Sequence, residues 1–177
     1  MVLILVRTLI DLFSAIPNTT ETQIEVTRDC ISWAIAGKRT FMRLSLQTRL
    51  VALFLESQKY HDALQLSTTL LKELRRLDDK MVLVEVQLLE SRVYHSLRNV
   101  PKSRASLTSA RTAANAIYCP PIMQAGLDMQ SGILLAEDKD FKTAYTLDGV
   151  ILMTVIRTFM RHWRGIILKM TQRQSWH

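Results

Sequence analysis

The side chains best suited to hold a metal ion or to attack a carbonyl carbon are histidines and cysteines, and they are scattered along this chain. The histidines are His61, His95, His162 and His177. None has another histidine or a cysteine at the short spacing typical of zinc ligands. Cys119 precedes Pro120 with no base evident beside it, so we interpret it as a structural thiol. The sequence therefore predicts no metal ligand and no nucleophilic cysteine.

Three other motifs could bind phosphate or act as paired acids, and each has a simpler structural interpretation. Residues 37–40 (GKRT) resemble the end of a phosphate-binding loop, but the earlier glycine and the preceding strand are missing. Glu85 and Glu90 are five residues apart, so on one helix they point to different faces. The basic run at 72–76 (KELRR) contains Glu73 and no aromatic residue that could stack on a base. We therefore predict a protein that is not an enzyme, with no catalytic or cofactor-binding residue.

The elements that carry these residues are predicted to be helices. Five Gly and four Pro in 177 residues are few, and apolar residues recur at helical spacing with no alternating strand pattern. A first helix is expected over 9–16, and a second from Thr20, its predicted N-cap, to a stop at Gly37. Further helices are expected from about 40, 60, 80, 101 and 122. Predicted core residues of the second and third helices are Ile24, Ile31, Ala34, Ile35, Phe41, Leu44, Val51 and Phe54.

A repeated turn suggests that these helices form hairpins. Residues 59–63, 101–105 and 140–144 each open a helix after a short polar turn and end in an alanine, at Ala63, Ala105 and Ala144. A small residue there would let the second helix of a hairpin lie close to the first. The spacing of about 40 residues predicts an all-α fold, a TPR-like right-handed α-solenoid of helix hairpins. An irregular helical bundle is the alternative.

Charge and cysteine content point away from nucleic acid, membrane and secretion. The net charge is +7, but the segment after Tyr145 carries five basic residues and one acid, which leaves 18 basic and 15 acidic residues elsewhere. Two isolated cysteines, Cys30 and Cys119, suit reduced thiols of the cytosol or nucleus. The apolar runs at 1–6 and 150–156 are too short to span a bilayer. No nucleic-acid or membrane partner is therefore expected.

From about residue 5 to residue 145 the sequence resembles the PCI-family lid subunits of the 26S proteasome. The matching runs are long and specific. They include residues 38–41 (KRTF), 83–91 (LVEVQLLES), 108–111 (TSAR), 114–121 (ANAIYCPP) and 127–133 (LDMQSGI). About four fifths of the chain is covered by this resemblance.

The resemblance implies a non-catalytic scaffold subunit of the regulatory-particle lid, which supports assembly and ubiquitin-dependent protein degradation. Its implied partners are other lid and regulatory-particle subunits and the core particle, in the cytoplasm and nucleus. In the family pattern, further repeats would precede Met1, and the PCI module would follow Tyr145. The chain is therefore expected to correspond to the helical-repeat region of such a subunit. A free-standing helical-repeat adaptor for other proteins is the alternative function.

Two segments are expected: a TPR-like helical-repeat segment over 1–145 and an aberrant basic tail over 146–177, outside the family fold. The family continues after residues 142–145 with a segment like SYFYEALEGY, followed by DDPKAI. A nucleotide sequence that encodes residues 158–165, read two bases later, spells FYEALEG. One that encodes residues 169–174 likewise spells DDPKA. We therefore interpret residues 146–177 as intron-derived sequence followed by an exon in the wrong frame.

Overall fold

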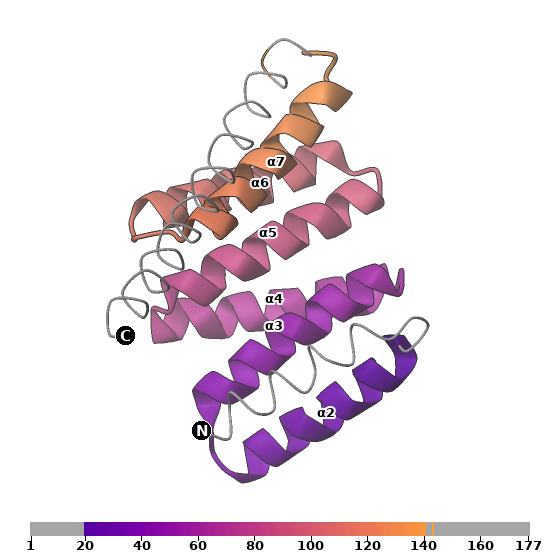
Figure 1. Cartoon of the computed structure of the whole chain (residues 1–177), viewed down its shortest axis with the longest axis vertical. Helices are drawn as coiled ribbons and strands as arrows, with labels where there is room; N and C mark the ends of the chain where they lie inside the picture. Colours follow the sequence, from indigo (N-terminus) through magenta and orange to yellow (C-terminus); the bar gives the residue numbers. More distant parts are fainter. Residues whose placement is uncertain (1–19, 141–142, 144–177) are drawn as a thin grey trace, which may run out of the picture. The chain divides into compact units, whose positions relative to one another are not determined.

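The computed structural model describes residues 20–140 and residue 143, and this part of the chain contains six α-helices and no strand. They are α2 (Thr20–Ala36), α3 (Thr40–Glu56), α4 (Tyr60–Leu77), α5 (Lys80–Ser96), α6 (Val100–Asn115) and α7 (Pro121–Glu137). The predicted all-α class is thus confirmed (Figure 1). The helix expected over 9–16 and the basic tail 146–177 lie outside the described residues. The chain divides into two compact units, residues 1–117 with α2 to α6 and residues 118–177 with α7.

In the first unit, α2, α3, α4 and α5 each end in a turn that contains one residue of left-handed backbone conformation, whereas α6 does not. These residues are Lys38, Gln58, Asp78 and Arg98, with φ values of 53° to 59°. Each follows the previous one by twenty residues. A helix of 16 to 18 residues and a very short turn therefore make one regular unit of chain. Consecutive helices joined in this way reverse direction, as the ribbons of α2 to α6 show in Figure 1.

Hydrogen bonds in three of these turns form the Schellman motif, which satisfies carbonyl groups at a helix end. After α3, the N–H of Gln58 donates to the carbonyl of Leu55, and the N–H of Lys59 donates to that of Phe54 at 2.9 Å. The same pair of bonds ends α2 and α5. At the end of α2, the left-handed residue is Lys38 rather than the neighbouring Gly37. Gly37 thus marks the end of the helix, as predicted, without supplying its left-handed conformation.

The core of the first unit is centred on α3, which contacts α2, α4 and α5. Its buried residues cover more than one face of the helix. They are Met42, Leu44, Leu46, Thr48, Leu50, Val51, Leu53 and Phe54. By contrast, α4 buries a single stripe, composed of Ala63, Ser67, Leu70, Leu71 and Leu74. A helix that is apolar on several sides must be covered on several sides. The core position of α3 therefore requires packing against both the preceding helix and the following helices.

The structure corrects the predicted alignment of the repeat. Ala63 is buried on α4 as expected, but Ala105 is exposed on α6. The equivalent buried position of α6 is Ser103, four residues after the N-cap Asn99, just as Ala63 is four residues after the N-cap Lys59. The small residues of the two hairpins are therefore 40 residues apart. Ala144, the third predicted copy, lies outside the described residues.

Ser103 is also part of a buried pair that joins α5 to α6. The Ser103 hydroxyl donates to the carbonyl oxygen of Ser91 at 2.8 Å, and the Ser91 hydroxyl donates to the carbonyl oxygen of Ser103 at 2.9 Å. Neither side chain is exposed to solvent. These bonds to backbone require the two helices to approach closely. The α6 face continues with Leu107, Ala110 and Ala114, and the small size of the two alanines suits such an approach.

An ion pair supports the contact between α3 and α4. Both guanidinium Nη atoms of Arg43 donate to the carboxylate oxygens of Glu73, one of them at 3.0 Å. The side chains are 22% and 32% exposed, so the pair is only partly screened by water. A fork-to-fork geometry of this kind is stronger than a single-point contact and fixes the rotation of α4 against α3.

In the second unit, α7 begins at Pro121, directly after Pro120. Its buried residues include Leu127 and Leu134, whereas Ile122 is 81% exposed. The Gln124 side-chain amide donates to the Asp128 carboxylate at 3.3 Å, one helical turn further along. This unit thus contributes one amphipathic helix to the described part of the chain.

Replacement of Gln58 by glycine should stabilise the protein. A left-handed conformation costs an L-residue about 1–2 kcal/mol, and glycine adopts it freely. Because glycine also makes the unfolded chain more flexible, we expect a net gain of about 0.5–1 kcal/mol in the free energy of unfolding. Urea denaturation followed by circular dichroism measures it. Gln65→Gly, within α4, is the matched control and should lose about 1 kcal/mol. Equal losses in both variants would contradict the turn geometry.

The register of α6 can be tested with two leucine substitutions. Ser103→Leu removes buried hydrogen bonds and inserts volume between α5 and α6, so it should destabilise the protein by about 2–4 kcal/mol. Ala105→Leu adds a similar volume at an exposed site and should change stability by less than about 0.5 kcal/mol. Thermal and urea unfolding report both values. A larger loss for Ala105→Leu would restore the alignment predicted from sequence.

Candidate functional site

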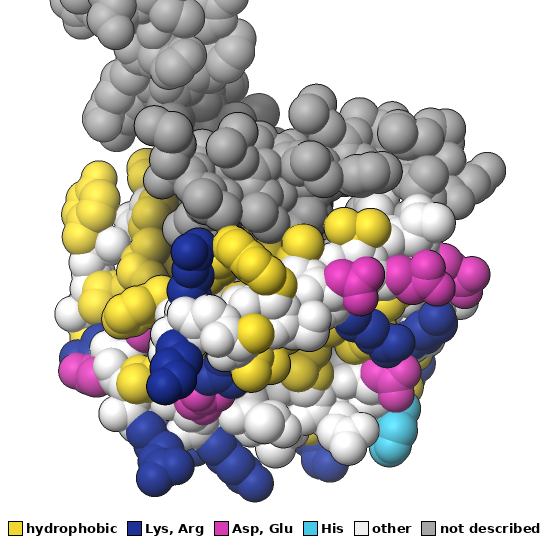
Figure 2. All heavy atoms as spheres, turned by 90° about the horizontal axis from the view of Figure 1, so that it is seen from below, with side chains coloured by type: hydrophobic (Ala, Val, Ile, Leu, Met, Phe, Trp, Pro, Cys, Tyr) yellow, Lys and Arg dark blue, Asp and Glu magenta, His cyan; other side chains and the backbone are white. Residues whose placement is uncertain are grey.

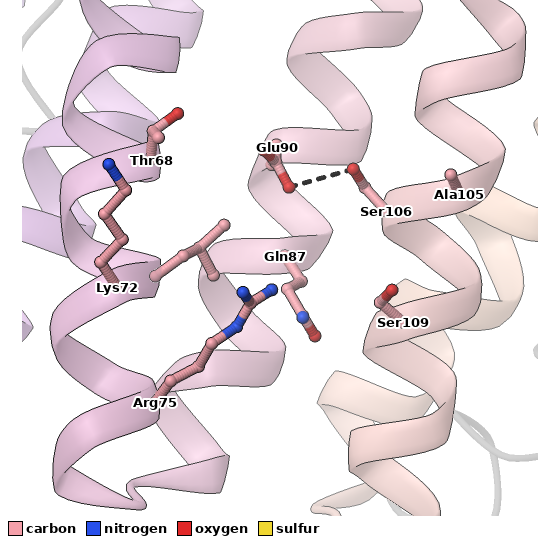
Figure 3. Close-up of a pocket in the computed structure, with 9 residues that line it drawn as sticks. Thr68, Lys72, Arg75, Gln87, Glu90, Ala105, Ser106 and Ser109 are labelled. Carbon is pink, nitrogen blue, oxygen red and sulfur yellow. Dashed lines mark hydrogen bonds between the residues drawn. The ribbon is translucent and has the colours of Figure 1, made fainter.

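The candidate site is a groove in the first unit, with walls formed by α4 and α6 and a floor formed by α5. It consists of two adjoining hollows of about 320 Å³ and 520 Å³. Arg75, Gln87 and Ser109 line both hollows, so the two form one continuous groove. We call this the α4–α6 groove. Figure 3 shows its first hollow, with side chains from all three helices.

Helical spacing explains which side chains line the groove. On α4 these are Thr68, Lys72 and Arg75, and on the α5 floor they are Leu83, Gln87 and Glu90. In each set the residues are three or four positions apart and therefore share one helix face. On α6, Ser106 and Ser109 are related in the same way. The groove is thus lined by one face of each of the three helices, and the residues on each face follow the helical repeat of about 3.6 residues per turn.

Glu90 is the acid of the first hollow, and its burial favours the neutral form. Burial raises the pKa of the Glu90 carboxyl above its ordinary value of 4.5. The Ser106 hydroxyl donates a hydrogen bond to Glu90 at 3.0 Å, shown in Figure 3, and Arg75 attracts the ionised form. Both effects lower the pKa, but burial outweighs them. Burial also raises the pKa of Tyr94, with a further contribution from the charge of Glu90.

Gln87 has an unsatisfied acceptor in the floor of the groove. The residue is 5% exposed, and its side-chain oxygen Oε1 is buried with no hydrogen-bond partner. A buried amide oxygen without a donor is costly, by about 1–3 kcal/mol. Because Gln87 lines both hollows, a small shift of its side chain would bring this oxygen within reach of a donor on a bound molecule.

The structure divides the basic run 72–76 among three roles. Glu73 pairs with Arg43 on α3, and Lys72 and Arg75 line the groove. Arg76 is exposed and is not among the groove residues. All three basic side chains of the run are exposed, and the groove is an additional feature of Lys72 and Arg75. Their spacing of three residues was the available signal, but the groove itself depends on α5 and α6.

The other residues considered for chemistry remain apart. Glu85 is exposed whereas Glu90 is half-buried, so the two do not form a pair of acids. Lys38, Arg39 and Thr40 belong to the turn before α3 and to its first residue. Within 20–140 and at 143, no group of three or more His, Cys, Asp or Glu residues could hold a metal ion. His162 and His177 lie outside these residues.

Both cysteines have thiols that are disfavoured as nucleophiles. Burial raises the pKa of Cys30, and Asp29 adds to this shift. Burial raises the pKa of Cys119, with a smaller contribution from Asp128. Because the thiolate is the reactive species, a raised pKa lowers reactivity at neutral pH. Both cysteines are free thiols.

A second exposed surface lies around the turn between α2 and α3. Trp33 is 46%, Ile35 57% and Phe41 74% exposed, so Ile35 and Phe41 are not the core residues that their spacing predicted. The Arg39 guanidinium lies 4.7 Å from the centre of the Trp33 ring. Figure 2, viewed from the α2 end, shows hydrophobic side chains exposed among lysine and arginine side chains. Exposed aromatic residues of this kind are typical of protein interfaces.

The described helices thus define an all-α protein of successive helix hairpins, with a groove suited to binding. Its sequence matches the family model described as the 26S proteasome regulatory subunit RPN6 N-terminal domain over residues 4–57. It is 60% identical over 142 residues to the probable 26S proteasome regulatory subunit rpn6 of Schizosaccharomyces pombe, which is 80% of this chain and 34% of that protein. The 26S proteasome non-ATPase regulatory subunit 11 homolog of Arabidopsis thaliana is 54% identical over 142 residues, with the same two shares.

The 26S proteasome regulatory subunit RPN6 of Saccharomyces cerevisiae is 51% identical over 140 residues, which is 79% of this chain and 32% of that protein. The chain therefore spans about one third of the length of the curated relatives it matches. Over about four fifths of its own length it is homologous to the regulatory subunit named RPN6 or non-ATPase regulatory subunit 11. The resemblance found in the sequence is thus confirmed.

The groove acid makes stability depend on pH. Because the pKa of Glu90 is higher in the folded than in the unfolded state, its contribution to stability is full below pH 4.5 and is lost as pH rises through the folded pKa. Glu90→Gln, which resembles the protonated acid, should raise the melting temperature at pH 7 by about 2 °C. The gap between the two proteins should close as pH falls.

The matched control is Glu85→Gln, on the same helix but exposed. Differential scanning fluorimetry between pH 4.5 and pH 8, with all three proteins in parallel, gives the comparison. If Glu90→Gln lowers the melting temperature at pH 7, the hydrogen bond and Arg75 outweigh burial, and the pKa direction is wrong.

Proposed function

We propose that this chain acts as a non-catalytic scaffold in the lid of the 26S proteasome regulatory particle, where it supports assembly and ubiquitin-dependent protein degradation. The observation that carries the proposal is an identity of 51% to 60% over at least 140 residues to proteins named as regulatory subunits of that particle. Its partners would be other lid and regulatory-particle subunits and the core particle. Because proteasome subunits act in the cytoplasm and the nucleus, we propose the same localisation for this chain.

The fold supports a scaffold role through its regularity. The left-handed turns recur every twenty residues, and α3 contacts α5, the first helix of the next hairpin, as well as its own partner α4. Contacts of this kind between successive hairpins are expected in a TPR-like right-handed α-solenoid, the arrangement that we propose. Such arrays present extended surfaces to other proteins. In the described part of the chain, no helix is long and apolar enough to cross a membrane.

The high identity to proteasome subunits favours this role over a free-standing adaptor for unrelated proteins. We propose further that the scaffold consists of residues 1–145, and that the basic tail 146–177 is not part of it. The tail supplies five of the 23 basic residues, so the net charge of +7 overstates the basic character of the remaining chain.

Co-purification tests the scaffold proposal. The full chain with an affinity tag, expressed in fission yeast, should bring down 26S regulatory subunits, identified by mass spectrometry against a tag-only control. Leu74→Asp is the matched negative control, because Leu74 is fully buried and an isolated charge there costs several kcal/mol. Recovery of the folded full chain without any regulatory subunit would overturn the proposal.

A further inference from the structure

We propose that the α4–α6 groove is a docking site for an extended acidic segment of a partner polypeptide, whose carboxylates bind Lys72 and Arg75 and whose backbone N–H binds Gln87. The proposal goes beyond the scaffold role, because it assigns one binding surface and the chemistry of its occupant. It stands on the charge of the groove, the unsatisfied acceptor in its floor and the length of its walls.

Charge complementarity favours an acidic occupant. Lys72 and Arg75 line the groove from one wall, three residues apart on α4. At the far end, Lys80 and Asp78 lie 4.0 Å apart and offset each other's charge. The remaining acid, Glu90, already accepts a hydrogen bond from Ser106. The two cations Lys72 and Arg75 outnumber this one acid, so the middle of the groove is net positive, and the fork of Arg75 matches a carboxylate bidentately.

The unsatisfied acceptor favours a polypeptide over a nucleic acid. Gln87 Oε1 is buried at the centre of the floor and needs a donor. Figure 3 shows Gln87 between the α4 side chains and Ser109. A peptide backbone offers an N–H donor at every residue except proline, together with acidic side chains. A phosphodiester backbone offers anionic acceptors but no N–H, so in a nucleic acid the donors lie on the bases and not beside the phosphates that would bind Arg75.

The dimensions of the groove fit a short extended segment. The wall on the α6 side runs from Ala105 to Ala116, the residue directly after α6, which at 1.5 Å per residue is about 16 Å. An extended peptide rises about 3.3 Å per residue, so roughly five residues would fill it. The end opposite Glu90 is lined by Leu83, Ala113 and Ala116 and suits an aliphatic side chain. The expected segment therefore combines acidic residues with one or two leucine-like residues.

Fluorescence anisotropy with defined peptides tests the proposal on the full chain. The probes are fluorescein-labelled GEDELVL and its reversed order GLVLEDE, because the groove does not fix the direction of the bound chain. At least one should bind. Arg75→Gln should weaken that binding about tenfold, the size expected for loss of a charged contact at an interface. Gln87→Met should weaken it about threefold to tenfold, because the backbone N–H loses its acceptor.

Arg76→Gln is the matched control, with the same change of charge on the same helix but outside the groove. It should alter binding by less than about twofold, because a rim charge is largely screened by salt. Glu90→Gln should tighten binding, because it removes the like charge. Circular dichroism confirms that each variant is folded.

Three outcomes would overturn the proposal. The first is no binding of either acidic peptide, or binding equal to that of the basic peptide GKRKLVL. The second is equal weakening by Arg75→Gln and Arg76→Gln, which would mean that net charge alone attracts the probe. The third is tighter binding of a labelled eight-residue oligothymidine that Arg75→Gln abolishes and Gln87→Met leaves unchanged. Because none of these depends on assembly, failure here leaves the scaffold proposal untouched.

Discussion

The close contact between α5 and α6 is the interaction on which the binding surface depends. Ser91 and Ser103 each donate to the backbone carbonyl of the other, inside a region from which water is excluded. A serine hydroxyl can reach the backbone of a neighbouring helix only if no large side chain lies between the two helices. These hydrogen bonds therefore hold α6 close against α5. Because α4 contacts α5 from its other side, α5 becomes a floor between two walls. Loss of this contact would remove the groove as well as the helix packing.

Much of this fold follows from the sequence because helix boundaries carry local chemical signals. Thr20, Pro101 and the polar turn before Lys80 mark helix starts, and Gly37 marks a helix end. The turns themselves were less predictable. Lys38, Gln58 and Arg98 have the left-handed conformation. A glycine at these positions would have indicated it, but the chemistry of lysine, glutamine and arginine does not. Their conformation comes from the Schellman hydrogen bonds of the preceding helix.

The register of α6 and the α4–α6 groove could not be predicted from the sequence for a related reason. Ala105 matches Ala63 in residue type, but Ser103 matches it in distance from the helix start. The distance from the helix start, and not the residue type, determines which position is buried. In the same way, Lys72 and Arg75 have the spacing of one helix face, yet a solvated face and a groove wall look identical within a single helix. The difference is made by α6, about thirty residues away in the chain. Only the packing of α4, α5 and α6 shows that Arg75 lines the groove and that Arg76 does not.

The twenty-residue rhythm of the left-handed turns limits how such a chain can evolve. One residue inserted into a helix would turn everything beyond it by about 100°, which moves the buried stripe of that helix out of the core. Substitutions on the outer faces carry no such penalty. The surface that meets other proteins can therefore diversify freely in residue type, while the number of residues between turns stays nearly fixed. Helix length, more than residue composition, is what this architecture constrains.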